Sequence, residues 1–261
     1  MAALNHDVPR SQVVDAIDRL MDNLVNIKDE TGEFLLHLDD GRIIDTKGWA
    51  GWEWTHGVGL FGMWRYFEQT GDKKALGIIK QWFEDRFAEG TPTKNINTMA
   101  PFITLAYLYE YEPDPRYIPY LDVWAEWLMA ADGLPKTEEG GFQHIVYNDE
   151  NPGEMWDDTL MMSVLPLARI GQILGRPHYI EAAKRQFRQA HTGEQPWSAG
   201  AAARPTRSGE PLRDVNIHAL LLVHWCSQML TAQGESVHGS INPFFPAPTA
   251  RSADTGTQRA P

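Results

Sequence analysis

The chain contains 261 residues, 43% of them hydrophobic, which suits a globular protein with one large domain or two small ones. Its formal net charge of −12 argues against nucleic acid or an anionic membrane surface as a partner. A single cysteine, Cys226, excludes an intrachain disulfide and disfavours a cysteine-based zinc site. Residues 1–10 contain no apolar signal core and no apolar run reaches membrane-spanning length, so we expect a cytoplasmic protein.

Apolar residues recur with helical spacing through the first 190 residues. The periodicity predicts helices over residues 11–27, 51–69, 72–88, 96–109, 115–131, 154–174 and 177–190. The polar stretch 28–50 contains a candidate hairpin through residues 34–38 and 42–44. Helices that are apolar around most of their circumference alternate with amphipathic ones, which is typical of stacked helical hairpins in an α/α toroid. A plain helical bundle or a solenoid gives a similar pattern, and periodicity alone leaves these open.

The composition changes after about residue 189. Residues 190–261 contain no Lys, and their five Arg balance five acidic residues, so the whole net charge belongs to residues 1–189. Only residues 215–230 show helical spacing, and the remainder is typical of disordered or extended chain. We therefore expect a toroid domain over residues 1–189 and an atypical tail over residues 190–261. The tail is either a natural Pro-rich extension or the product of a lost reading frame.

The segment Met155–Met162, with the sequence MWDDTLMM, carries the strongest functional signal. It places two adjacent carboxylates beside an indole, where a Gly-rich loop ends and an apolar helix begins. An acid next to a flat aromatic ring can protonate or grip a sugar. Capping of the helix by Asp157 or Asp158 is the competing structural interpretation. The upstream sequence GGFQH, Gly140–His144, favours the functional one.

Together these two blocks resemble the unsaturated rhamnogalacturonyl hydrolases, glycoside hydrolase family 105, which are related to family 88. Weaker agreement comes from WEWTHGVGL, Trp52–Leu60, and NINTMAP, Asn95–Pro101, so that the resemblance spans roughly residues 12–189. It implies an all-α fold, the (α/α)6 toroid of helical hairpins. This chain would then hold an incomplete toroid followed by an irregular C-terminal tail.

The family acts on oligosaccharides left by polysaccharide lyases, which carry a 4,5-unsaturated uronic acid at the non-reducing end. An Asp protonates C4, water adds at C5, and the resulting hemiketal opens to release the next sugar. The resemblance places that Asp at Asp158, two residues after Trp156, and leaves Asp157 as a cap or supporting residue. Because the carboxyl group must act first as an acid and then as a base, we expect a partly apolar pocket around it.

The remaining site residues also follow from the resemblance. His144 is expected near the uronate or its glycosidic oxygen, although such a His is more often a hydrogen-bonding loop residue. Trp156 and Trp54 are candidate stacking faces for the sugar, with core packing as the alternative for each. Asn97 is a candidate polar residue of the cleft, with helix capping as its alternative.

The sequence departs from the family where its composition changes. Relatives continue for well over a hundred residues and supply a His-Gly-Trp segment and a Trp-x-Arg-Gly-Asn segment that complete the ring and bind the uronate. Neither segment occurs here, which favours a truncated or frame-shifted chain after about residue 189. An open toroid would expose apolar helix faces, so we expect weak or no activity and self-association through those faces.

Two other functions stay open: an unsaturated glucuronyl hydrolase of the family 88 type, and a catalytically inactive carbohydrate-binding remnant. We expect an oligosaccharide as the partner, and no metal or cofactor, because the nine His show no metal-ligand spacing and the relatives need none. The sequence GVGLFG, Gly57–Gly62, has the spacing of a dinucleotide-binding loop, but no predicted strand precedes it. There we expect glycine to permit close helix packing instead.

Overall fold

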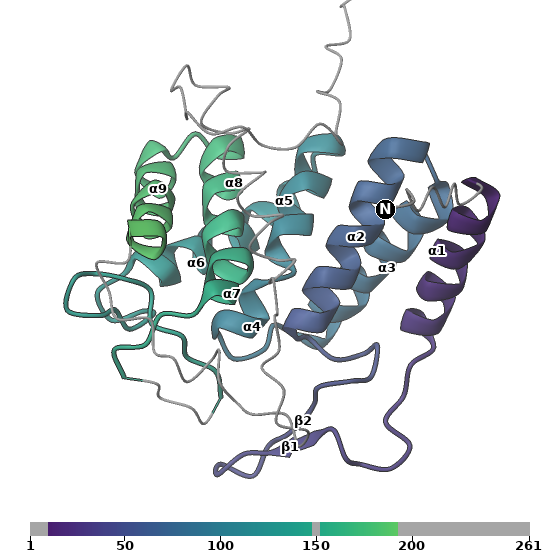
Figure 1. The fold of residues 1–261 in the computed structure, drawn as a ribbon, viewed down its shortest axis with the longest axis horizontal. Coiled ribbons are helices and arrows are strands. Elements are labelled where there is room, and N and C mark those ends of the chain that lie inside the picture. Colours follow the sequence, from purple (N-terminus) through teal and green to yellow (C-terminus); the bar gives the residue numbers. More distant parts are fainter. Residues whose placement is uncertain (1–9, 148–151, 193–261) are drawn as a thin grey trace, which may run out of the picture. The chain divides into compact units, whose positions relative to one another are not determined.

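The computed structural model describes residues 10–147 and 152–192 (Figure 1). They all belong to one unit of the chain, Met1–Ala219. The helix predicted over residues 215–230 and the rest of the predicted tail beyond residue 192 lie outside the described residues. No helix in the described part is both long and apolar enough to cross a membrane.

The described residues are mostly helical, which confirms the all-α class. The helices are α1 (Arg10–Val25), α2 (Trp54–Thr70), α3 (Lys73–Glu89), α4 (Ile96–Met99), α5 (Phe102–Tyr111), α6 (Ile118–Met129), α7 (Asp157–Thr159), α8 (Leu165–Ile173) and α9 (Pro177–Thr192). A 3-10 turn, Pro115–Tyr117, precedes α6, and a π-helical segment, Leu160–Val164, joins α7 to α8. The predicted hairpin is confirmed: β1 (Leu35–His37) pairs antiparallel with β2 (Ile43–Asp45), and Leu36 faces Ile44.

Two predicted helix boundaries are wrong. The helix predicted over residues 96–109 is divided at Ala100–Pro101 into α4 and α5, because proline has no N–H to continue the ladder of hydrogen bonds. The helix predicted over residues 154–174 begins only at Asp157. Residues 154–156 are not helical and run beside the loop at His144, whose N–H donates to the carbonyl of Glu154 at 2.8 Å.

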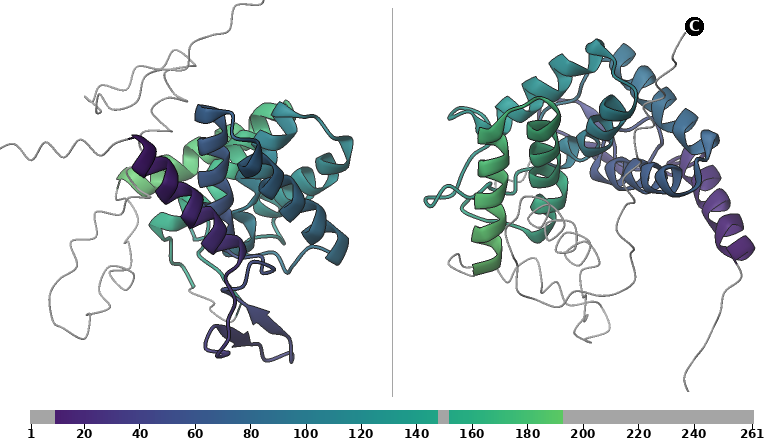
Figure 2. Two further views of the ribbon diagram at one scale, coloured as in Figure 1. Left: turned by 90° about the vertical axis from the view of Figure 1, so that its right-hand side faces the viewer. Right: turned by 90° about the horizontal axis from the view of Figure 1, so that it is seen from above.

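The long helices form consecutive hairpins, α2 with α3, α5 with α6 and α8 with α9 (Figures 1 and 2). Helices α2, α5 and α8 contact one another in that order, and α1 lies beside α2 at one end of the series. In α5 the run Phe102–Leu108 is buried throughout, whereas α3 alternates buried and exposed positions. This matches the predicted alternation of helices buried on all sides with helices that have a wet face, as in an incomplete α/α toroid.

Aromatic side chains fill the core between α2, α3, α5 and α6. Trp52 lies parallel to Trp124, with ring centroids 6.1 Å apart, and Phe102 stacks on Trp124 at 4.5 Å. The indole N–H of Trp52 donates to the carbonyl of Thr98 at 2.7 Å, which ties the start of α2 to α4. Several of the ten tryptophans are therefore structural, and only the more exposed ones remain candidates for contact with a sugar.

Helix α2 closely approaches the junction between α4 and α5 at Gly57. A Cβ atom added there would lie 2.5 Å from the Cβ of Ala100 and 2.9 Å from the backbone nitrogen of Pro101. No side chain larger than hydrogen fits without displacing backbone. The packing role predicted for glycine in the Gly57–Gly62 sequence is confirmed at this position.

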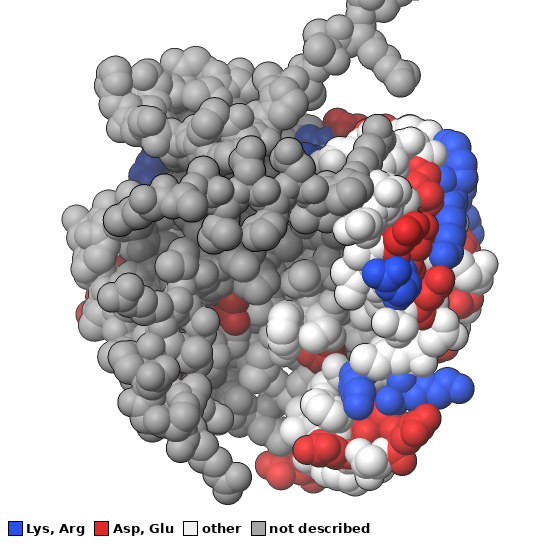
Figure 3. All heavy atoms as spheres, turned by 45° about the vertical axis from the view of Figure 1, so that its right-hand side comes forward, with Lys and Arg blue, Asp and Glu red and all other residues white. Residues whose placement is uncertain are grey.

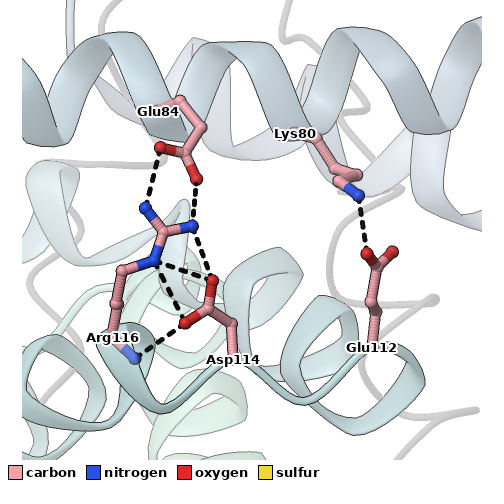
Figure 4. Close-up of polar contacts among 5 residues, drawn as sticks. All are labelled: Lys80, Glu84, Glu112, Asp114 and Arg116. Atoms are coloured by element: carbon pink, nitrogen blue, oxygen red, sulfur yellow. Dashed lines mark hydrogen bonds and ion pairs between the residues drawn. The ribbon is translucent and has the colours of Figure 1, made fainter.

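Exposed ion pairs cover the outer side of α3. Arg116 pairs with Glu84 of α3 at 2.9 Å and with Asp114 at 2.6 Å, and Lys80 pairs with Glu112 at 2.8 Å (Figure 4). Acidic and basic side chains also lie next to one another on the described part of the face drawn in Figure 3. Because these groups are exposed, water and salt screen them, and they orient the connection between α5 and α6 more than they stabilise it.

Candidate active site

Asp158 and His144 lie side by side at the start of α7. The Nδ1 atom of His144 is 3.4 Å from Oδ1 of Asp158 and 2.8 Å from the hydroxyl oxygen of Thr159. The His144 side chain is buried, whereas the Asp158 side chain is 35% exposed with its Oδ1 atom buried. Asp158 therefore presents a carboxyl group that is in contact with a buried imidazole and still accessible from outside.

Trp156 covers one face of that imidazole. The two rings are parallel within 5°, with centroids 4.1 Å apart. The indole N–H of Trp156 donates to Oε2 of Glu154 at 2.9 Å, which fixes the orientation of the ring. Trp156 is half-buried, so it both packs on His144 and leaves part of its surface open.

The π-helical segment Leu160–Val164 directly follows this group. The hydroxyl of Ser163 donates to the carbonyl of Thr159 at 2.6 Å, within a stretch that is wound more widely than an α-helix. Single π-helical turns within α-helices are frequent at functional sites. Here the segment sets the rotation of α7, and with it the direction of Asp158, relative to α8.

Helix α9 anchors the loop that carries His144. Gln186, fully buried, accepts the N–H of Phe142 at 2.7 Å and donates to the carbonyl of Gly140 at 2.8 Å. Gln189 donates to the carbonyl of Glu139 at 2.7 Å. Side chains of α9 thus bind both an N–H group and two carbonyl groups of the backbone just before His144.

The starts of α2 and α4 form a second part of the site. Helix α4 contacts both α2 and the π-helical segment, and the N–H of Ile96 donates to the carbonyl of Ile145 at 3.0 Å. Asn97 is partly exposed at this junction. The helix cap of α4 is Asn95, which accepts the N–H of Thr98 at 3.0 Å, so the capping alternative for Asn97 is wrong.

Trp54, at the first position of α2, is 41% exposed, so the core-packing alternative is wrong for this residue. No hydrogen bond, ion pair or ring contact within the described part of the chain joins Trp54 to the other predicted site residues. Asp158, His144 and Trp156 are therefore brought together, Asn97 lies at an adjoining junction, and Trp54 lies at the start of α2. The side chain of Asp157, the predicted cap, lies outside the described part.

The sequence-based prediction missed Glu53 and Tyr147. Glu53 precedes α2 and is 2% exposed, and burial raises the pKa of its carboxyl group, while polar interactions with Tyr147 and Asn97 oppose the rise. Burial and the nearby Glu53 raise the pKa of the Tyr147 hydroxyl. The only signal was an acidic residue between two tryptophans, Trp52 and Trp54, at the start of an apolar helix.

Thr159 was also missed as a site residue, although it is part of the predicted motif. Its hydroxyl contacts His144 more closely than Asp158 does. Among the described residues no group of three or more His, Cys, Asp or Glu side chains is arranged to hold a metal ion. The expectation that no metal or cofactor takes part stays a prediction.

Comparison with known proteins places this arrangement in a family. The sequence model of Glycosyl Hydrolase Family 88 matches residues 26–199. The unsaturated rhamnogalacturonyl hydrolase YesR of Bacillus subtilis (strain 168) is 32% identical over 138 residues, which are 52% of this chain and 40% of that protein.

Solved structures agree with this match. A possible member of the GH105 family from Salmonella enterica serovar Paratyphi A is 61% identical with a TM-score of 0.67. A possible member of the same family from Klebsiella pneumoniae is 58% identical with a TM-score of 0.68. Each match covers 70% of this chain and 48% of the other, so the chain spans about half the length of these relatives.

Proposed function

Because the chain belongs to Glycosyl Hydrolase Family 88, we propose that it is a glycoside hydrolase that acts on lyase-generated pectin fragments. The family predicted from the sequence is thereby confirmed. The proposed reaction releases a 4,5-unsaturated uronic acid from the non-reducing end of rhamnogalacturonan oligosaccharides. The similarity to YesR, an unsaturated rhamnogalacturonyl hydrolase, supports this substrate class.

The proposal rests on the contact between Asp158 and His144, whose Oδ1 and Nδ1 atoms are 3.4 Å apart, and on the stacking of His144 against Trp156. In the proposed reaction Asp158 donates its proton to C4 of the double bond, and positive charge develops at C5 and the ring oxygen. Water then adds at C5 and returns a proton to Asp158. The resulting hemiketal opens, and the bond to the next sugar breaks. The carboxyl group ends the cycle protonated, as it began.

The surroundings of Asp158 suit both of its roles. Its position in the first turn of a helical run favours the carboxylate, because the helix dipole is positive there. Burial of Oδ1 beside His144 favours the neutral acid. We propose that His144 orients the carboxyl group or contacts the glycosidic oxygen. Trp156, Trp54 and Asn97 would contact the sugar.

A turnover assay tests the function directly. We expect an unsaturated rhamnogalacturonan disaccharide to lose the ultraviolet absorbance of its double bond slowly with the 261-residue chain, and not at all with Asp158→Asn. Asp85→Asn makes the same chemical change on the exposed face of α3 and should leave the rate unchanged. Equal rates for Asp158→Asn and the wild-type chain would refute the proposed role of Asp158.

The family match also favours the second candidate, an unsaturated glucuronyl hydrolase of the family 88 type. The two substrates share the unsaturated ring and differ in the adjoining sugar. Parallel assays with a rhamnogalacturonan-derived and a glycosaminoglycan-derived disaccharide distinguish the two. Sugar binding without turnover of either would identify the third alternative, an inactive carbohydrate-binding protein.

The division into a toroid domain over residues 1–189 and an atypical tail over 190–261 stays a prediction. So do the cytoplasmic location and the self-association through apolar helix faces. Exposed Val13 and Leu20 on α1 support self-association, because they lie on the helix at one end of the series. Sedimentation velocity at several protein concentrations tests it.

A further inference from the structure

The carboxyl group of Glu53 is buried at the start of α2. Glu53 is 2% exposed, and its Oε1 atom has no hydrogen-bond partner among the described residues. Leaving a buried carboxylate without partners is costly, so a carboxyl group persists in such a place only where its surroundings compensate. The catalytic steps proposed above do not use Glu53.

The neighbours of Glu53 are polar and come from separate parts of the chain. The side chains of Asn97, in α4, and Tyr147, in the loop after His144, both interact with its carboxyl group. Tyr147 also interacts with the side chain of Asn95, the residue that caps α4. We call Glu53, Asn95, Asn97 and Tyr147 the Glu53 cluster.

The Glu53 cluster lies where three elements of the candidate site meet. Tyr147 follows His144 by three residues, and the bond from Ile96 to Ile145 holds that loop against α4. Helix α4 in turn contacts α2 and the π-helical segment that follows Asp158. A shift of the Glu53 carboxyl group would therefore be transmitted to Asn97 on one side and to the His144 loop on the other.

We propose that Glu53 is a positioning residue of the active site, whose buried carboxyl group orients the Asn97 amide and the Tyr147 hydroxyl. Its effect on turnover rests on the function proposed above. Glu53 acts through these two neighbours and is assigned no contact with the reacting atoms. By holding both, it fixes α4 and the His144 loop at a constant separation around the substrate.

The test compares Glu53→Gln, which keeps the shape of the side chain, with Glu53→Ala, which removes its polar end. Glu84→Gln, an exposed position on α3, is the matched control. The spectroscopic readout is the nuclear magnetic resonance shift of the Asn97 side-chain amide and the Tyr147 ring, with Tyr147→Phe identifying the ring signal. Circular dichroism confirms that each variant is folded.

We expect Glu53→Ala to shift both signals and to lower kcat/KM by about 100-fold, since small misplacements near a site have effects of this size. Glu53→Gln should recover most of the rate, and Glu84→Gln should match the wild-type chain in both readouts. Recovery by the isosteric amide would separate positioning from general loss of packing. Unchanged signals for Asn97 and Tyr147 in Glu53→Ala would overturn the proposal at any level of activity, as would shifted signals with an unchanged kcat/KM.

Absence of turnover in the wild-type chain would refute the proposed function instead. The two spectroscopic signals would then decide on the orienting role of Glu53 by themselves. Shifts in Glu53→Ala that Glu53→Gln reverses would support it, and their absence would overturn it. The two proposals can therefore fail independently.

Discussion

The imidazole of His144 lies parallel to the indole of Trp156, with ring centroids 4.1 Å apart and planes 5° apart. Parallel contact of this kind contributes roughly 0.5–1.5 kcal/mol beyond the buried area of the rings. The hydroxyl of Thr159 also lies 2.8 Å from the Nδ1 atom of His144. Together the ring contact and this polar contact leave the imidazole little freedom to rotate. His144 therefore reaches Asp158 in one orientation.

Replacing the indole should loosen this geometry. We expect Trp156→Ala to lower kcat/KM by about tenfold, the equivalent of roughly 1.4 kcal/mol, because His144 loses its stacking partner. Trp156→Phe keeps a flat ring but loses the bond to Glu154, so its rate should fall between the two. Steady-state kinetics measure the order of the three rates. A Trp156→Ala chain as active as Trp156→Phe would show that the ring contact does not matter.

The anchor of the His144 loop can be tested through stability. Gln186→Leu leaves the buried N–H of Phe142 and the carbonyl of Gly140 without partners. We expect the free energy of unfolding to fall by about 1–3 kcal/mol for each polar group that loses its hydrogen bond. Gln189→Leu, which removes a single bond to the carbonyl of Glu139, serves as the control and should cost less. Urea denaturation measures both, and equal losses would contradict the double anchor.

Replacing either of two glycines of α2 by alanine should change the stability of the fold, in opposite directions for the two positions. Gly57→Ala places a Cβ atom 2.5 Å from that of Ala100, so the helices must separate and the chain is expected to lose stability by about 1–3 kcal/mol. Gly62 is exposed with no atom within 4 Å of an added Cβ, and Gly62→Ala should gain up to about 1 kcal/mol from helix propensity. Thermal denaturation of the pair checks both signs. A stable Gly57→Ala chain would contradict the close approach of α2 to the junction between α4 and α5.

Acid should destabilise the fold through His56. Its Nε2 atom lies 2.8 Å from the carbonyl of Gly48, and Nδ1 accepts the N–H of Glu53 at 3.2 Å, an arrangement that suits the neutral ring. Burial lowers the pKa of His56 below its ordinary value of 6.5. The unfolded chain then binds the proton more readily, so the stability present above pH 6.5 is lost as the pH falls toward the folded-state pKa.

We expect His56→Gln to flatten the dependence of the unfolding free energy on pH below 6.5, where the wild-type chain loses the contribution of the neutral ring. His37→Gln, at an exposed position, is the control and should keep the wild-type slope. Buried Glu53 has the opposite sign: its raised pKa favours the folded state most below 4.5, and this contribution is lost as the pH rises. Urea denaturation at a series of pH values measures the slopes. Identical slopes for the wild-type chain and His56→Gln would contradict burial of a neutral ring.

Periodicity predicted most of the fold because each long helix carries its own apolar pattern, as in residues 54–70. It failed where the interruption was local. Proline is tolerated in the first turn of a helix as well as directly before one. The position of Pro101 therefore could not show that α5 starts after it and that α4 is a separate turn. The non-helical stretch before Asp157 is held by a bond from the N–H of His144, a partner distant in sequence.

The site was predicted in part, and for a similar reason. Adjacent residues of a motif, such as Trp156 and Asp158, could be named from the chain alone. Glu53 could not, because an acidic residue before a helix is normally a solvated cap, and only the packing of α4 and Tyr147 buries it. Conversely, Asn97 is of a residue type that often caps helices, but the side chain of Asn95 accepts the N–H of Thr98, so Asn95 is the cap of α4.

The π-helical segment Leu160–Val164 lies between the residue that carries the acid, Asp158, and the helix that packs in the core, α8. One residue corresponds to a rotation of about 100° in a regular helix, so an inserted residue redirects whatever precedes it without altering the face that follows. The contacts of α8 with α5 and α9 and the aim of Asp158 are therefore adjustable independently. Deleting one residue from this stretch should leave a well-packed helix whose acid no longer faces His144.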